Sequence, residues 1–200
     1  GRCAPRRSSS DPSRRRRRWR RRQSATVSSA PVGTVTDLLV EVEVHPGECH
    51  DLPSGTCHAL GAGVLVAEVQ TPSDTTFRVF DWGRTDRTLH IDEAMQCIQF
   101  CEPTPLNDPI VTESNGVRTS ALSSTPYYAI ERLDATKACS VQIDPDGAPE
   151  VLMVIAGSIS MDPLVADRGR TLLLPAALAP RSMSMEAGTS VLRITVVSGG

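Results

Sequence analysis

The sequence predicts an all-β protein built as a sandwich or jelly roll, and three observations favour this class. The 200 residues include fifteen Pro and fourteen Gly, which interrupt the chain with turns. Lys is almost absent, and Val, Leu, Ile and Thr gather in short runs rather than at helical spacing. In the second half of the chain these runs recur with turn-forming residues between them, as two packed sheets require.

Residues 1–33 are expected to form a disordered, Arg-rich tail. Residues 1–22 hold eleven Arg and one Asp, which gives this segment a formal charge of +10. Because the whole chain has a net charge of −2, the remaining residues carry −12. The tail has no apolar periodicity and cannot bury enough surface to offset its ordering entropy. It is interpreted as an arm for nucleic acid or an anionic surface. A fragment, or upstream bases read in the wrong frame, explains it equally well, because the chain does not begin with Met.

The acidic composition of the remaining residues argues against several partners. Nucleic acid binding needs clustered cations, so the folded part is not expected to bind it. The longest uncharged apolar run, residues 151–161, is too short to span a bilayer, and no membrane partner is expected. The six Cys come without a signal peptide, which favours reduced thiols and a cytoplasmic location.

Residues 34–104 are predicted to form the first β portion. Ordered sequence is expected from Thr36, where TDLLVEVEV alternates at the two-residue period of a strand. Further strand-like runs are LPSGTCHAL, GVLVAEVQ and TTFRVFDW. The segment IDEAMQCIQF predicts a short helix that Asp92 caps.

Residues 105–125 are predicted to be a polar, Pro-bearing linker. Residues 126–200 are predicted to form a second β domain, with DPDG as one of its turns. Its expected strands are YYAIERL, CSVQID, the single buried run VLMVIAGSISM, GRTLLLPAA and SVLRITVV.

The stretch GECHDLPSGTCHALGA, residues 47–62, follows the pattern G-x5-P-x-G-x2-H and places its histidine at position 58. This pattern resembles the second signature motif of the cupin superfamily, a double-stranded β-helix in which that histidine binds a metal. The usual terminal Asn of the motif is replaced by Ala. Pro53 and Gly55 are expected to make a tight turn, and the following strand to point His58 into the barrel and Cys57 outward.

The second β domain repeats part of this pattern. Gly169 and Pro175 stand 122 residues after Gly47 and Pro53, and Pro180 occupies the position of the histidine. We interpret residues 126–200 as a degenerate cupin half without a metal site. Chance recurrence of Gly and Pro is the alternative.

The stretch PSGTCHALGAGVLVAEVQTPSDTTFRVFDWGR is similar to the type I mannose-6-phosphate isomerase family, as are LHIDEAMQCIQF, PEVLMVIAGSIS and GRTLLLPAAL. The similarity covers about residues 36–198. It implies the C-terminal part of one cupin followed by a second, degenerate cupin-like module. It also implies a zinc-dependent aldose to ketose isomerisation, which interconverts the sugar phosphates mannose 6-phosphate and fructose 6-phosphate through an enediol by proton transfer between C1 and C2.

The resemblance implies roles for three residues. His58 matches the zinc-binding histidine, Arg78 matches the active-site arginine, and Glu68 falls where the family can place a pocket carboxylate. Zinc polarises sugar oxygens, and a guanidinium adds fixed positive charge where negative charge develops. A carboxylate near the metal relays protons, although the sequence does not identify the general base.

Each of these residues has a structural alternative. His58 can be a satisfied core histidine, Arg78 can form an ion pair with Asp74 or Asp81, and Glu68 can form an ordinary strand salt bridge.

Two cysteine groups were also considered. A structural zinc site built from residues 49, 50, 57 and 58 is disfavoured because adjacent strand residues point to opposite faces. Cys97 and Cys101 favour a one-turn contact of thiols on the helix.

A zinc site needs three or four protein ligands. The family draws the others, a Gln-x-His pair and a Glu, from a segment upstream of the His58 motif, and no matching pair precedes that motif here. We therefore expect a truncated form that holds zinc weakly and turns over little or no substrate. The alternative function is a non-catalytic cupin module for sugar binding or regulation.

Overall fold

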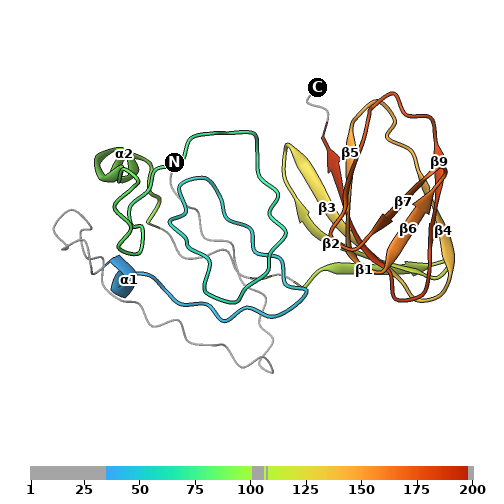
Figure 1. Ribbon diagram of the computed structural model, residues 1–200, viewed down its shortest axis with the longest axis horizontal. Helices are drawn as coiled ribbons and strands as arrows, with labels where there is room; N and C mark the ends of the chain where they lie inside the picture. Colours follow the sequence, from blue (N-terminus) through green and yellow to red (C-terminus); the bar gives the residue numbers. More distant parts are fainter. Residues whose placement is uncertain (1–34, 101–105, 107, 198–200) are drawn as a thin grey trace, which may run out of the picture. The chain divides into compact units, whose positions relative to one another are not determined.

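The structure is a computed structural model that describes residues 35–100, 106 and 108–197. The Arg-rich tail predicted for residues 1–33, and Cys101, lie outside these residues. The described residues divide into two compact units (Figure 1). We call residues 35–48 and 52–100 the N-terminal unit, and residues 49–51, 106 and 108–197 the C-terminal unit.

The C-terminal unit contains ten strands in its described residues, and every pairing between them is antiparallel. They are β1 (Ile110–Ser114), β2 (Val117–Ser124), β3 (Tyr128–Ala135), β4 (Cys139–Ile143), β5 (Glu150–Ala156), β6 (Ser158–Met161), β7 (Leu164–Asp167), β8 (Thr171–Leu174), β9 (Arg181–Met185) and β10 (Ser190–Val196). The expected turn in DPDG is present, since the Ala148 N–H donates to Pro145 O at 3.0 Å.

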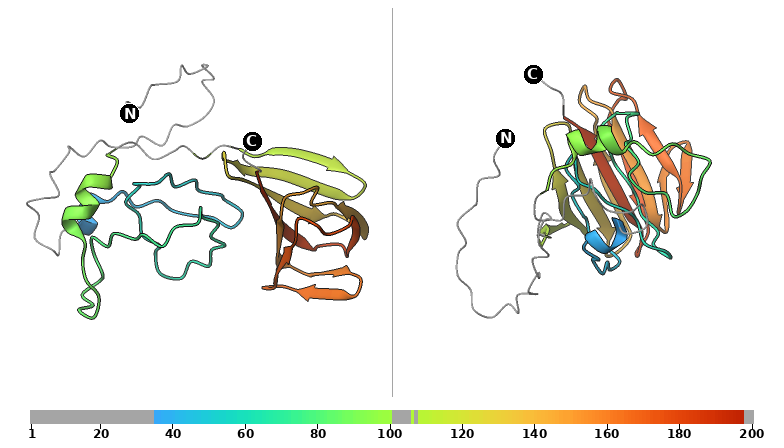
Figure 2. Two further views of the ribbon diagram at one scale, coloured as in Figure 1. Left: turned by 90° about the horizontal axis from the view of Figure 1, so that it is seen from above. Right: turned by 90° about the vertical axis from the view of Figure 1, so that its left-hand side faces the viewer.

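The strands form two sheets that face each other (Figure 2). The six-stranded sheet has the order β1-β2-β3-β10-β5-β8, and the four-stranded sheet has the order β4-β9-β6-β7. This is the two-sheet architecture that the sequence predicts for the second module.

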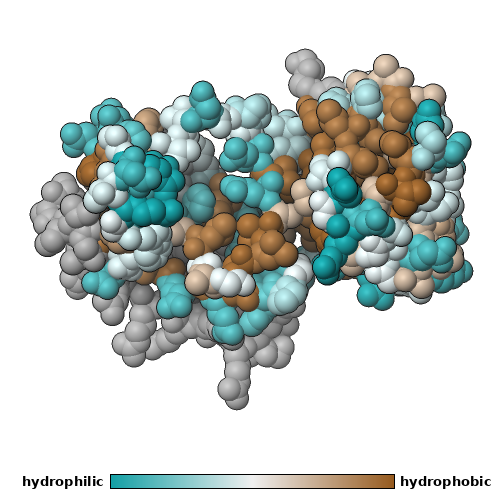
Figure 3. Space-filling model, in the orientation of Figure 1, coloured by the Kyte–Doolittle hydropathy of each residue, from teal (hydrophilic) through white to brown (hydrophobic). Residues whose placement is uncertain are grey.

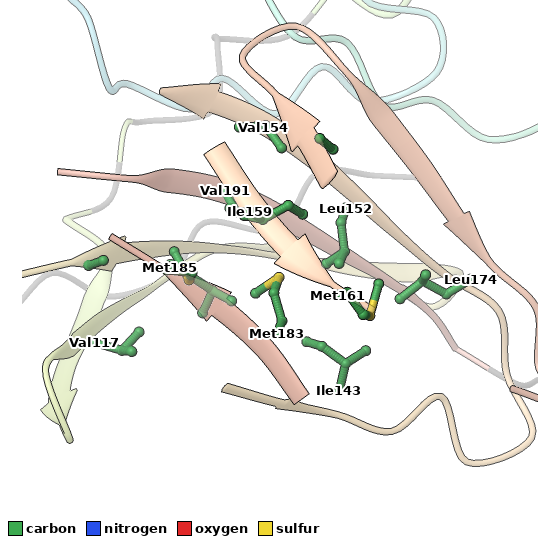
Figure 4. Packing of buried hydrophobic residues seen from close by; sticks show 13 residues of the cluster. Val117, Ile143, Leu152, Val154, Ile159, Met161, Leu174, Met183, Met185 and Val191 are labelled. Carbon is green, nitrogen blue, oxygen red and sulfur yellow. The ribbon is translucent and has the colours of Figure 1, made fainter. Parts of the chain in front are cut away.

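The core of the C-terminal unit lies between these sheets and is closely filled (Figure 4). In β5, alternate residues 150, 152 and 154 are buried, at the two-residue period of a strand with one inward face. Leu152 and Val154 from the larger sheet meet Met183 and Met185 from β9 of the smaller sheet. Aliphatic and thioether side chains therefore occupy the interior of this module.

The segment predicted as a linker, residues 105–125, contains β1 and most of β2. The two strands form a hairpin in which Ser114 pairs with Val117 across Asn115 and Gly116. Both turn residues have positive φ, 51° and 83°, as a two-residue turn between twisted strands requires. All five residues of β1 are exposed, so the hairpin lacks the apolar alternation on which strand prediction depends.

The run predicted as one buried strand, residues 151–161, divides at Gly157. The residues before it form β5 in the larger sheet, and those after it form β6 in the smaller sheet. Gly157 has φ +69°, and a Cβ there would lie 2.6 Å from Thr189 Oγ1. A glycine is required where the chain passes from one sheet to the other.

The N-terminal unit contains two helices and, within its described residues, no hydrogen-bonded strand. Its helices are α1 (Val35–Leu38) and α2 (Ile91–Cys97). The predicted helix is thus confirmed, but its N-cap is His90 rather than Asp92, which lies in the first turn. The predicted strands between residues 36 and 81 are not formed, and the chain there is irregular.

Apolar side chains of this irregular region are open to solvent, and apolar surface is visible on it (Figure 3). Val40, Val42 and Val44 keep the alternation of a strand but are 55%, 40% and 42% exposed, and Leu65 is 99% exposed. Alternation creates an apolar face, but burial of that face needs a second layer. No helix among the described residues is long and apolar enough to cross a membrane.

Candidate functional site

The expected tight turn lies at Pro53–Thr56. The Thr56 N–H donates to Pro53 O at 3.0 Å, and Gly55 has φ +87°. The positive φ at the third position requires glycine, as in a type II turn. A Cβ at Gly55 would also lie 2.5 Å from the Cys97 carbonyl oxygen, so this position leaves no room for a side chain.

The turn is fixed to the C-terminal end of α2. The Gln99 N–H donates to Gly55 O at 2.9 Å, and Gln99 Nε2 donates to Ser54 O at 3.1 Å. These two hydrogen bonds join segments 45 residues apart in sequence. They hold the backbone three and four residues before His58.

His58 follows this turn and is exposed. Its Nδ1 lies 2.9 Å from the carbonyl oxygen of Thr56. A carbonyl only accepts, so Nδ1 carries the proton and Nε2 keeps its lone pair for a ligand. Metal-binding histidines are oriented by this kind of bond. An exposed side chain does not fit the alternative of a core histidine.

The exposures of Cys57 and His58 are the reverse of those expected from a strand. Cys57 is half-buried and His58 is exposed, and burial raises the pKa of the Cys57 thiol. The reason is that residues 56–60 form no strand, so no barrel wall directs the two side chains.

Arg78 begins a hairpin-like loop that returns to His90. The His90 N–H donates to Arg78 O at 2.8 Å, and the Arg78 N–H donates to His90 Nδ1 at 3.3 Å. At the tip, the Arg84 N–H donates to Asp81 O at 2.9 Å. Trp82 and Gly83 between them both have positive φ, 53° and 79°, which is the geometry of a type I′ turn.

Three arginines surround the carboxylate of Asp81, which is 5% exposed. Arg87 donates to it through Nε at 2.8 Å and through Nη2 at 2.7 Å. Arg84 Nη2 lies 3.0 Å from Oδ1, and Arg78 Nε lies 4.0 Å from Oδ2. We call these four side chains the arginine cluster. The alternative ion pair between Arg78 and Asp81 is thus formed, but at 4.0 Å it lies at the upper distance limit for an ion pair. Arg84 and Arg87 lie closer to the carboxylate.

Helix α2 connects the two candidate residues through their backbones. Its N-cap His90 is bonded to Arg78, and Gln99, just beyond its C-terminal end, is bonded to the turn before His58. A seven-residue helix is about 10 Å long. The backbone supports of Arg78 and His58 are therefore held one short helix apart.

Glu68 is exposed, and within the described residues no ion pair or side-chain hydrogen bond involves it. The strand salt bridge considered as its alternative is not formed there. Nor do the described residues contain any group of three or more His, Cys, Asp or Glu that could hold a metal ion. Of the three predicted site residues, His58 is therefore the one that offers a metal an oriented donor.

Sequence reasoning missed the residues that support the site. These are His90, Arg84, Arg87 and Gln99, for which the motif predicts no role. The Trp82-Gly83 turn flanked by Asp and Arg was the available signal, since it brings residues 81 and 84 together.

The repeat predicted at an offset of 122 residues recurs in local geometry. Gly47 and Gly169 have φ +93° and +87°. The Leu178 N–H donates to Pro175 O at 2.9 Å, as Thr56 does to Pro53. The two turns differ at the third position, where Ala177 replaces glycine and is not among the residues with positive φ.

Known proteins similar to the chain are sugar phosphate isomerases by name. It is 30% identical over 148 residues to the mannose-6-phosphate isomerase of Streptococcus mutans, covering 69% of this chain and 46% of the relative. It is 36% identical over 103 residues to a probable mannose-6-phosphate isomerase of Bacillus subtilis, covering 49% of this chain and 33% of the relative.

Among solved structures, a mannose 6-phosphate isomerase from B. subtilis matches with a TM-score of 0.50 and 19% identity, over 61% of this chain and 40% of that one. The all-β cupin fold expected from the sequence is confirmed. The chain spans less than half the length of these relatives. No protein-family profile matches it.

Proposed function

The chain belongs to the mannose-6-phosphate isomerase family as a C-terminal portion, and from this premise we propose that the complete protein interconverts mannose 6-phosphate and fructose 6-phosphate. The reaction is an aldose to ketose isomerisation in which a proton moves between C1 and C2 through an enediol. The similarity to named isomerases supports this assignment. Unpaired thiols at Cys49, Cys57, Cys97 and Cys139 favour the cytoplasm as its location.

Three residues of this chain contribute to the proposed site. His58 is a metal ligand through Nε2, and Arg78 stabilises the negative charge that develops on the substrate oxygens. Glu68 is a carboxylate available for proton transfer. The observation that carries the proposal is the bond from His58 Nδ1 to Thr56 O, because it presents a free nitrogen on an exposed side chain.

Zinc, when bound, would polarise the sugar oxygens and stabilise the developing enediolate. The imidazole of His58 fits this metal, but one imidazole does not complete a zinc shell. In our proposal the other ligands come from a segment upstream of the His58 motif. In our proposal the present chain alone holds zinc weakly and has little or no turnover.

A chimera tests this function. The upstream part of the S. mutans relative is placed before residue 36 of this chain, and isomerisation of mannose 6-phosphate is measured in a coupled assay with zinc present. We expect turnover from the chimera and little from the chain alone. His58→Ala is expected to abolish turnover and to lower the zinc content, while Arg78→Ala abolishes turnover with zinc retained.

His45→Ala is the matched control, since His45 is also exposed and lies in the same unit. It is expected to leave both zinc and turnover unchanged. Equal turnover by the His58→Ala and His45→Ala chimeras would falsify the assignment of His58. Turnover that survives Arg78→Ala would contradict the role of Arg78, and a chimera that binds the sugar phosphate without any turnover would favour the non-catalytic sugar-binding module instead.

A further inference from the structure

The arginine cluster carries more positive charge than its carboxylate neutralises. Three guanidinium groups face one carboxylate, which leaves a formal charge of +2 at the cluster. In an ordinary structural ion pair the charges cancel, and one bidentate arginine, Arg87, already satisfies Asp81 in this way. The additional two arginines are not needed to compensate the buried charge.

The guanidinium groups also keep unused donors. Each has five N–H groups, and Arg87 uses only Nε and Nη2 to bind the Asp81 carboxylate. Arg84 and Arg87 are 57% and 39% exposed, so their remaining donors are accessible to a ligand in water.

Asp81 brings these cations close together. Arg84 Nη2 is 3.0 Å and Arg87 Nη2 is 2.7 Å from the same atom, Asp81 Oδ1. The two Nη2 atoms therefore cannot be farther apart than the sum of those distances, which one tetrahedral anion can span. Two guanidinium groups held this close together form a preorganised site for an anion. The free energy needed to order them is supplied by folding, so it does not reduce the affinity for the ligand.

An open hollow adjoins these side chains. It has a volume of about 580 Å³ and is lined by Arg84, Arg87, Thr85 and Asp81 together with apolar Phe80 and Leu89. Two cations, one hydroxyl and an apolar wall suit a phosphorylated molecule with a carbon skeleton.

We propose that the arginine cluster binds a phosphate group, with Arg84 and Arg87 as the ligand-binding residues and Asp81 as the residue that positions them. A phosphate dianion matches the surplus charge of +2, and arginine forks match its oxygens. The identity of the phosphate as that of a sugar phosphate rests on the proposed function.

The test is titration of the full chain with inorganic phosphate at fixed ionic strength, followed by calorimetry. We expect saturable binding that Arg84→Gln weakens about tenfold, the effect of losing a charged hydrogen-bond donor. Arg118→Gln is the matched control, because Arg118 is 51% exposed and pairs with Glu113 in the other unit. The Arg-rich residues 1–22 contribute equally to both variants, so the difference between them reports the cluster.

A second variant tests the positioning role of Asp81. Asp81→Asn raises the formal charge of the cluster from +2 to +3 but removes the carboxylate that holds Arg84 and Arg87 together, so phosphate should bind it more weakly than the parent chain despite the greater charge. If circular dichroism shows that Asp81→Asn does not fold, the comparison of Arg84→Gln with Arg118→Gln decides. No saturable binding by the parent, or equal binding by these two variants, would overturn the proposal.

Mannose 6-phosphate and mannose separate this proposal from the isomerase function. Binding of inorganic phosphate that depends on Arg84, without any binding of mannose 6-phosphate, supports the anion site and counts against the isomerase assignment. Mannose 6-phosphate binding that is independent of Arg84 supports the isomerase assignment and overturns the anion site. Binding of both phosphates but not of mannose supports the two together.

Discussion

In the C-terminal unit each apolar strand lies beside a hydrogen-bonded neighbour and faces a second sheet, whereas similar runs in the described part of the N-terminal unit form no sheet and keep exposed apolar side chains. The C-terminal unit is stabilised by its core. The N-terminal unit is held together by local interactions, which are one glycine turn, one short helix and a cluster of ion pairs. An apolar alternation thus stabilises a protein only where another layer covers it.

The units also treat buried carboxylates differently. Glu150 in the C-terminal unit is 1% exposed and receives both Nε and Nη2 of one arginine, Arg193, at 3.0 and 2.6 Å. The hydrogen bond that Arg193 donates to Glu150 raises the pKa of Arg193 against the opposing effect of burial. Asp81 in the N-terminal unit is approached by three arginines. One site is neutral and closed, and the other has surplus charge and is open.

The largest expected effect tests whether the core carries the stability of the C-terminal unit. Leu152→Ala removes a side chain with 0% exposure and should lower the free energy of unfolding by about 2–5 kcal/mol. The control is Leu65→Ala, at a residue 99% exposed in the N-terminal unit, which should change little. Urea denaturation followed by far-UV circular dichroism measures both. Equal losses would mean that the described core does not distinguish the units.

The next effect compares the two carboxylate sites. Arg193→Met leaves Glu150 buried without its partner and should cost about 1–3 kcal/mol, a range reduced because Arg193 is 24% exposed. Arg84→Gln should cost less than about 1 kcal/mol, because Asp81 keeps both bonds from Arg87. Thermal denaturation of the two variants gives the comparison. A larger loss for Arg84→Gln would show that the surplus arginine is structural.

A third prediction concerns the turn before His58. Gly55→Ala places a Cβ 2.5 Å from Cys97 O at φ +87° and should destabilise the N-terminal unit by about 1–3 kcal/mol. Gly63→Ala is the control, since Gly63 also has positive φ but no atom within 4 Å of the added Cβ. The fluorescence of Trp82 in urea reports this unit. If both variants lose the same stability, backbone strain rather than contact with α2 explains the glycine.

The smallest effect is chemical. Burial raises the pKa of the Cys57 thiol, so the folded chain holds less thiolate at pH 8 than the unfolded chain and should react more slowly with iodoacetamide. Because the unfolded thiol ionises first, this group lowers stability as pH rises through its unfolded pKa near 9. Mass spectrometry of Cys57 in the folded chain and in urea measures the rates. Identical rates would contradict the half-buried position.

The sequence predicted the C-terminal unit better than the N-terminal one for a physical reason. Residues 128–135 and 150–156 alternate because one face of each strand meets a core. Strand β1 is exposed along its whole length and gave no such pattern, although Asn115-Gly116 marks its turn. Residues 39–44 alternate but lie in no strand of the described structure, so the pattern there predicted strands that are not formed.

The candidate site divides in the same way. The turn at Pro53 and Gly55 depends on adjacent residues, and the motif predicted it. The contact of Gln99 with Ser54 spans 45 positions and depends on how the chain returns to itself. The convergence of Arg84 and Arg87 on Asp81 likewise follows from the turn at Trp82-Gly83, where both residues have positive φ.

The attachment of both ends of α2 has a consequence for how the protein can change. The length of the helix fixes the distance between its two attachments, which are His90 at one end and Gln99 at the other. One added residue would lengthen it by about 1.5 Å and rotate one attachment by about 100° relative to the other. Insertions between residues 90 and 99 should therefore not be tolerated. The spacing between the backbone supports of His58 and Arg78 is thereby set by the residue count of a single helical segment.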